Sequence, residues 1–184
     1  MNIYKRKGCK SIGYRATYSG HEIDERDFHE EFVVSLIAKL FNKKTKIRIG
    51  TKTTILTELN SKAMVTFLNR AIGLPLGSKK DIRIPTMIRH SKERIKGSFL
   101  RGLADTDFSL SFKKRHRIFH YYPSINFVSE SRSLVQSVGK LLKKYNIPFS
   151  IQFDAKRVRN ETITTRSDIN IYGKNNVERW MKNI

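Results

Sequence analysis

The chain has 184 residues, and 37 lysines and arginines against 16 aspartates and glutamates give it a formal net charge of +21 at pH 7. This excess predicts a polyanionic partner, nucleic acid first, while a hydrophobic content of 39% with 11 Phe and 7 Tyr indicates a folded protein rather than a basic tail. A single cysteine, Cys9, excludes an internal disulfide and a multi-cysteine zinc site. Because no apolar run reaches the roughly 18 to 20 residues of a membrane span and the first residues lack a signal-peptide pattern, we expect a cytoplasmic protein with no membrane partner.

The first half of the chain contains one strongly marked helix, over residues 28–41. Six carboxylates lie just before it or in its first turn, where they complement the helix dipole. Short β-prone basic segments lie before and after it, and a short helix follows. The predicted order is therefore β, β, α, β, β, α. The apolar residues at the 3.6-residue spacing of one helix face are Phe28, Phe32, Val33, Leu36, Ile37, Leu40 and Phe41.

The second half repeats this order, with its own amphipathic helix over residues 131–145. The segment SKAMVTFLNRAI at 61–72 matches GKNNVERWMKNI at 173–184 with an offset of 112 residues, and Tyr18 lies over Phe127 with an offset of 109. Two similar α+β lobes follow, because similar segments bury similar faces. We place the first lobe and a linker in residues 1–84 and the second lobe in residues 85–184.

One helix, over residues 91–107, has no partner in the repeat. Its apolar stripe contains Ile95, Phe99 and Leu103, and Ser91 is its predicted N-cap. With the offset of 109, Met1 falls near Leu110, just after this helix. The first lobe therefore lacks the helix, and we expect that the chain begins one helix late.

The end of this unpaired helix carries two acids, Asp105 and Asp107. The dipole of a helix repels carboxylates at its C-terminal end by about 0.3 to 1 kcal/mol each, a penalty that a divalent cation would remove. Gly97 and Gly102 within the helix predict a close approach to another helix. The alternative is a buried amphipathic helix with a polar end turn.

The residues from Leu100 to Phe108 resemble the nine-residue motif of the LAGLIDADG homing endonucleases. They match it at the first Leu, the Gly, the second Leu and both Asp. The preceding segment, with Gly-Ser-Lys at 77–79 and Ile-Pro at 84–85, is similar to the linker that this family has before its second motif. The repeat order also matches the αββαββα lobe of the family, so the resemblance covers the whole chain.

The resemblance implies a fold, a reaction and a set of roles. The fold is two pseudo-symmetric αββαββα lobes, the first without its N-terminal helix, whose antiparallel sheets form a saddle in the major groove of double-stranded DNA. The activity is site-specific, Mg²⁺-dependent phosphodiester hydrolysis, and it serves intron or intein mobility. Asp107 is then the metal ligand and a catalytic residue, and Gly102 and Asp105 serve the helix interface. Lys79 is the basic catalytic residue, for which the alternative is an ordinary solvated loop lysine beside Lys80.

The basic strands and hairpins supply the candidate DNA contacts. Alternation along a strand can place long donors on one face of a sheet, where they bind phosphates or read bases. For any one of these residues the alternative is an ordinary solvated surface charge. The candidates are Lys46 and Arg48 in the first lobe, Lys113, Arg115 and Arg117 in a hairpin, and Lys156, Arg157 and Arg159 in a later strand.

Two departures from the family pattern leave alternatives open. Phe108 replaces the Gly that usually follows the last Asp, so we expect backbone strain or a different helix end there. A single motif helix is consistent with a late start, a decayed remnant, or two copies that pair their helices, which predicts a monomer or a weak homodimer. The rival function is a DNA- or RNA-binding protein that does not cleave, such as a maturase that binds intron RNA.

Overall fold

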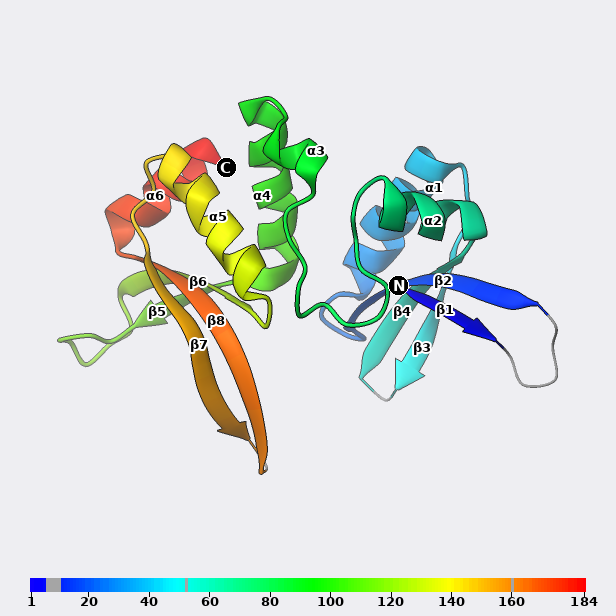
Figure 1. Cartoon of the computed structure of the whole chain (residues 1–184). Helices are drawn as coiled ribbons and strands as arrows, with labels where there is room; N and C mark the ends of the chain where they lie inside the picture. The colour runs from blue at the N-terminus through cyan, green and yellow to red at the C-terminus, as the bar shows by residue number, and fades with distance from the viewer. Residues whose placement is uncertain (6–10, 52, 160) are drawn as a thin grey trace. The chain divides into compact units, whose positions relative to one another are not determined.

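The computed structural model describes residues 1–5, 11–51, 53–159 and 161–184, so Cys9 lies outside the described residues. The chain divides into two compact units, Met1–Gly77 and Ser78–Ile184. Each unit is a four-stranded antiparallel sheet with helices against one face, as Figure 1 shows. The predicted α+β fold class is therefore confirmed. In the described part of the chain, none of the helices combines the length and the apolar composition that a membrane crossing requires.

The first unit follows the predicted order of two strands, a helix, two strands and a helix. Its sheet has the strand order β1-β2-β4-β3, so β2 and β4 form the centre. The elements are β1 (Asn2–Lys5), β2 (Ile12–His21), the π-helix η1 (Phe28–Val33) continuing as α1 (Val34–Phe41), β3 (Lys46–Thr51), β4 (Thr54–Asn60) and α2 (Lys62–Arg70).

Local chemistry sets the ends of the helices in the first unit. Asn42 ends α1 in the left-handed backbone conformation, with φ at 48°, which Asn adopts more readily than most residues. Ser61 begins α2, and its Oγ accepts a hydrogen bond from the Met64 backbone N–H at 3.3 Å. The helices bury one apolar stripe each against the sheet. The buried core is Ala16, Val33, Ile37, Leu59, Met64, Val65 and Leu68.

The second unit contains the same order of elements after two additional helices. Its sheet has the strand order β5-β6-β8-β7. The elements are α3 (Thr86–Arg89), α4 (Glu93–Asp107), β5 (Phe108–Lys113), β6 (Tyr122–Ser129), α5 (Arg132–Lys144), β7 (Ser150–Arg159), β8 (Thr162–Tyr172) and α6 (Lys174–Asn183).

Strand register confirms the internal repeat residue by residue. In the first sheet Ala16 pairs with Leu59, and in the second sheet Ile125 pairs with Ile171. These pairs are related by the predicted offsets of 109 and 112, and all four side chains are buried. The outer strands agree, because the pairing of Asn2 with Arg15 corresponds to that of Ser111 with Ser124. Helix α4 has no counterpart among the described residues of the first unit.

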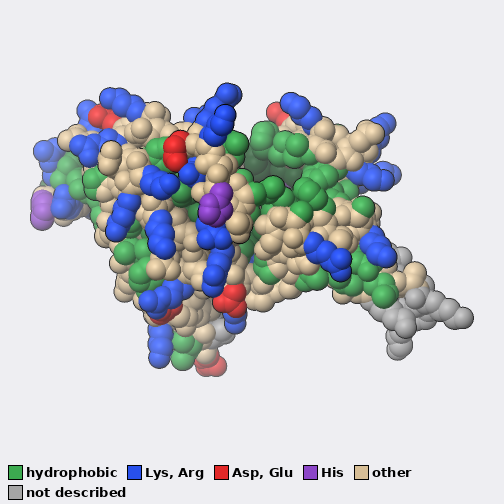
Figure 2. All heavy atoms as spheres, turned by 45° about the horizontal axis from the view of Figure 1, so that its top comes forward, with side chains coloured by type: hydrophobic (Ala, Val, Ile, Leu, Met, Phe, Trp, Pro, Cys, Tyr) green, Lys and Arg blue, Asp and Glu red, His purple; other side chains and the backbone are tan. Residues whose placement is uncertain are grey.

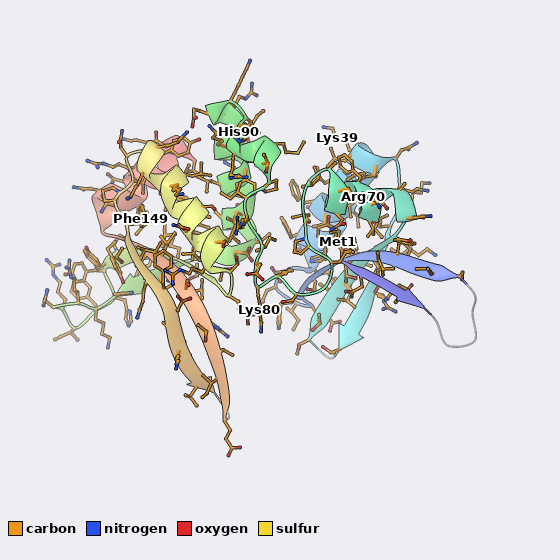
Figure 3. All side chains as sticks on the ribbon, in the orientation of Figure 1. Met1, Lys39, Arg70, Lys80, His90 and Phe149 are labelled. Carbon is orange, nitrogen blue, oxygen red and sulfur yellow. The ribbon has the colours of Figure 1, made fainter. Side chains whose placement is uncertain are left out.

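The core of the second unit lies between its sheet and helices α4, α5 and α6. Leu100 of α4 and Val135 of α5 are fully buried in it, with Ile169 of β8 beneath them. Helix α5 approaches the start of β7 closely, because a Cβ atom on Gly139 would lie 3.1 Å from the ring of Phe149, which Figure 3 labels. The apolar side of α4 is fixed by this packing, and the last turn of α4 is therefore fixed as well.

Two details differ from the sequence-based expectations, and a third decides between two of them. Ile82 and Ile84 belong to the core of the second unit, so the linker before residue 84 lies with that unit and not with the first. Helix α4 begins at Glu93 instead of residue 91, because the hydroxyl of Ser91 donates to the Ile88 carbonyl at 2.7 Å and closes α3. Phe108 has φ at −98° and ψ at 152°, so of the two outcomes expected there, backbone strain or a different helix end, the second is found and the helix ends directly in a strand.

Candidate functional site

Asp107 is the last residue of α4, and its position is set by the residue that follows it. The backbone N–H of Phe108 donates to the Ala104 carbonyl and ends the helix. The ring of Phe108 then stacks on Phe127 of β6 at 4.7 Å between centroids and lies 5.1 Å from Trp180 of α6. Because an aromatic residue is anchored in the core immediately after the acid, Asp107 has a defined place at the junction of helix and sheet.

Burial and a nearby ammonium act on the Asp107 carboxylate in opposite directions. Its side chain is exposed, yet the surrounding protein desolvates the carboxylate and raises its pKa above the ordinary value. The ammonium of Lys79 acts in the opposite direction and lowers the pKa. Asp107 also lies at the negative end of the α4 dipole. A cation at this point would relieve both the desolvation and the dipole repulsion.

The structure brings Lys79 near Asp107 through a segment that is tied to the second unit. The hydroxyl of Ser131, the N-cap of α5, donates to the Ile82 carbonyl at 2.6 Å. The backbone N–H of Ile82 donates to the Lys79 carbonyl at 3.3 Å. The turn that carries Lys79 is therefore attached, through Ile82, to the start of α5. Figure 3 labels the neighbouring Lys80 in this segment. The two predicted catalytic residues therefore belong to one unit, and the Lys79 ammonium lies close enough to lower the pKa of Asp107.

The two glycines of α4 have different surroundings. Gly97 is buried inside the second unit, where a Cβ atom would lie 3.4 Å from the Tyr145 hydroxyl. Gly102 is exposed, and a Cβ atom there would meet no atom within 4 Å. Asp105 is exposed on the same last two turns. Gly97 thus permits packing within the unit, and the predicted interface role of Gly102 and Asp105 stays a prediction.

Each sheet has a second face, opposite its helices, which we call the open face. In the first unit the open face carries Lys46 and Arg48, since Lys46 pairs with Glu58 and Arg48 with Leu56 in β4. The Arg48 guanidinium lies 2.8 Å from the Glu58 carboxylate, which Arg15 also contacts at 3.0 Å. These ion pairs hold Arg48 and Arg15 in fixed orientations on the open face, as phosphate or base recognition requires.

The end of β5 and the loop that follows it carry three predicted DNA contacts, and each charge lies over an aromatic ring. Such pairs orient a cation while its outer side stays available to an anion. The imidazole of His120 contacts the Phe112 carbonyl at 2.7 Å and closes the loop. The pairs are Lys113 with Tyr172 at 4.8 Å, Arg115 with Tyr122 at 4.2 Å and Arg117 with Tyr121 at 4.6 Å, measured to the ring centroid.

The basic residues of β7 do not share one face, in contrast to the prediction. Arg157 pairs with Thr164 of β8, and Lys156 pairs with Thr165. Because side chains alternate along a strand, Arg157 lies on the open face and Lys156 on the side of the helices. The side chain of Arg159 lies outside the described part of the structure. Arg157 is therefore the DNA-binding candidate of this strand that the register supports.

Charge is concentrated in the second unit. Residues 78–184 carry 23 Lys and Arg against 9 Asp and Glu, a net charge of +14 with His neutral. Figure 2 shows basic side chains over much of the face in view and few acidic ones. No cluster of three or more His, Cys, Asp or Glu that could hold a metal ion occurs among the described residues. A metal at Asp107 would thus need most of its ligands from water and from a bound molecule.

Sequence reasoning missed a polar group on the open face of the second sheet, formed by Asn126, Asn170 and Asp168. Asn126 lies on β6, and the other two lie on β8. Buried Ile169 and Ile171 alternate with them, and this alternation was the available signal. Two amides and one acid do not stand out in the sequence of a chain with a net charge of +21.

Comparison with known proteins gives a match at the level of structure. No family model matches the chain, and no curated protein matches it. The complex of I-DmoI with DNA and calcium has a TM-score of 0.65 at 15% identity, over 98% of this chain and 80% of that one. The K262A mutant of I-SmaMI gives 0.58 at 10% identity, over 99% and 79%. The LAGLIDADG homing endonuclease I-GzeII in complex with its DNA target gives 0.54 at 9% identity, over 96% and 74%. The chain therefore has the fold of the LAGLIDADG homing endonucleases.

Proposed function

We propose that the chain is a site-specific DNA endonuclease of LAGLIDADG type, which binds a long double-stranded target and hydrolyses a phosphodiester bond with Mg²⁺. The observation that carries the proposal is the placement of Asp107 at the end of α4, at the junction of helix and sheet, in a unit with a net charge of +14 and within electrostatic reach of Lys79. The fold match supports it, since solved structures of I-DmoI contain target DNA in the presence of Mg or Mn.

The residues present fit a magnesium ion that is shared with the substrate. Mg²⁺ takes oxygen ligands, keeps several waters and is commonly held by one or two carboxylates together with substrate phosphates. Asp107 supplies one such carboxylate, and DNA oxygens and water would have to supply the other ligands, because no cluster of three or more metal-ligating side chains occurs in the described ranges. The bound ion would stabilise charge on the phosphate and on the leaving oxygen.

The residues of the chain have separable tasks in this proposal. Asp107 holds the metal, and Lys79 attracts the scissile phosphate and stabilises the negative charge that develops during hydrolysis. The DNA backbone on either side of the scissile phosphate is bound by Arg157 and by the three cations that lie over aromatic rings, Lys113, Arg115 and Arg117. Lys46 and Arg48 do the same for the first unit.

The test compares Asp107→Asn with Glu178→Gln, which removes one negative charge from an exposed position on α6. A target selected from a randomised duplex library is incubated with each protein and Mg²⁺. We expect Asp107→Asn to lower the cleavage rate by about 100-fold or more, since metal stabilisation contributes several kcal/mol. Binding in EDTA should persist, and Glu178→Gln should cleave at the wild-type rate. Full cleavage by Asp107→Asn would refute the assignment.

A second function is a DNA- or RNA-binding protein that does not cleave, since basic side chains held by ion pairs and aromatic rings suit binding without hydrolysis. Supercoiled plasmid incubated with the chain and Mg²⁺ separates the two functions, because an endonuclease with a single working metal site nicks it. A homodimer that pairs two α4 helices would linearise it. If neither product forms and structured intron RNA binds more tightly than duplex DNA, a non-cleaving maturase is the better assignment.

A further inference from the structure

Three side chains on the open face of the second sheet form a hydrogen-bonded row, which we call the Asn-Asn-Asp row. The Asn126 amide nitrogen donates to the Asn170 side-chain oxygen at 2.9 Å and to the Ile169 carbonyl at 3.3 Å. The Asn170 amide nitrogen donates to the Asp168 carboxylate at 2.7 Å. All three residues are part-buried, and their strands are fixed by the core residues on the opposite face.

The direction of the hydrogen bonds in this row is fixed by its acid. An ionised carboxylate can only accept, so the NH₂ group of Asn170 must face Asp168 and its oxygen must face Asn126. Both amide hydrogens of Asn126 are then in use. Asn170 keeps one hydrogen to donate, and Asp168 keeps one oxygen that can only accept. The row thus presents a donor and an acceptor side by side in a defined orientation.

An unneutralised acid on this face is unexpected for a surface that binds only phosphates. Asp168 forms no ion pair among the residues that the structure describes, although the unit has a net charge of +14. The first unit differs at the equivalent positions. Glu58, the counterpart of Asn170 by the offset of 112, is paired with two arginines, and Leu56 stands where Asp168 does. The second unit therefore presents a hydrogen-bond acceptor at a position where phosphate binding alone would favour a lysine or an arginine.

We propose that the Asn-Asn-Asp row reads adenine in the major groove, an inference that rests on the proposed DNA-binding function. Adenine presents an acceptor, N7, beside the N6 amino donor. Asn170 would donate to N7, and Asp168 would accept from N6. Guanine places two acceptors at this edge and thymine places its O4 there, so both would face the carboxylate with repulsion. Cytosine offers only its N4 donor and makes half of the contacts.

The test is base preference, measured by selecting duplexes from a randomised pool with the full chain in EDTA. The informative variant is Asp168→Leu, because the equivalent strand position of the first unit already holds Leu56. Glu178→Gln is the matched control for the loss of one negative charge, since it lies on α6. Far-UV circular dichroism and Tm verify that each variant is folded.

We expect the wild-type pool to contain a position where adenine is preferred by about ten-fold or more, as one good base contact allows. Asp168→Leu should lose that preference and keep or increase its affinity for random duplex, while Glu178→Gln keeps the preference. An unchanged preference in Asp168→Leu, or an equal loss in the control, would overturn the inference and leave DNA binding intact. A wild-type chain that selects no duplex refutes the proposed function itself.

Discussion

The two adjacent basic residues of β7 offer a direct test of which sheet face binds DNA. Arg157 and Lys156 are both exposed and differ by one position, yet their partners Thr164 and Thr165 place them on opposite faces. Replacing each by Gln removes one positive charge and keeps a long polar side chain. Net charge changes equally in the two variants, so any difference in DNA affinity reports the face.

The size of the expected difference follows from counterion release. One phosphate contact contributes about 0.9 to the slope of log K against log salt, which at roughly 0.15 M salt corresponds to about five-fold in affinity. Arg157→Gln should therefore lower the slope by about 0.9 and the affinity by about five-fold. Lys156→Gln should leave the slope nearly unchanged.

Fluorescence anisotropy with a labelled duplex, titrated at a series of salt concentrations, measures both quantities. Equal losses in the two variants would show that the contribution is non-specific charge and does not depend on the face. A larger loss in Lys156→Gln would place the DNA on the helix side and refute the register argument. Both hairpin positions are remote from the buried core, so folding should be unaffected, and Tm provides the check.

Two further predictions concern the support of α4. Leu100→Ala should lower the free energy of unfolding by about 2 to 5 kcal/mol, because Leu100 is fully buried in the core of the second unit; urea denaturation measures it, and a loss below about 1 kcal/mol would contradict the packing. Glu93→Gln should lower Tm at pH 7, and the effect should diminish as the pH falls below 4.5. The hydrogen bond from the buried Lys96 ammonium, at 2.7 Å, lowers the pKa of Glu93 below its ordinary 4.5. That stabilisation is present above pH 4.5 and is lost as the pH falls through the lowered pKa. If the difference in Tm between the wild type and Glu93→Gln persists undiminished at low pH, the ion pair with Lys96 is not its cause.

The fold was predictable because its signals are periodic and occur twice. The apolar spacing of residues 28–41 and 131–145 specifies two helices with one buried face each, and the segments around them match at constant offsets. The pairing of Ala16 with Leu59 and of Ile125 with Ile171 reproduces those offsets in space. A repeat in the sequence constrains the register of two sheets, because a slip of one residue would expose every buried side chain.

The details that could not be predicted depend on tertiary contacts. Whether the segment before residue 84 belongs to the first or second unit is decided by the burial of Ile84 and by the Ser131 hydroxyl, far away in the sequence. The face of Arg157 depends on the irregularity between Gln152 and Ala155, which shifts the register of β7 against β8. Strand alternation alone, counted across such a bulge, assigns the wrong faces.

The candidate site illustrates why a motif can be read from sequence while its environment cannot. The pattern around Asp107 identifies the acid, but the proximity of Lys79 requires that two separate segments dock on one core. Arg101 of α4 adds a third attachment, since its guanidinium donates to the Ile184 carbonyl at 2.7 Å. Helix α4 is thus held at its apolar side, at its end through Phe108, and at the chain terminus. Because all three attachments lie within the second unit, Asp107 and Lys79 are placed by the packing of that unit alone.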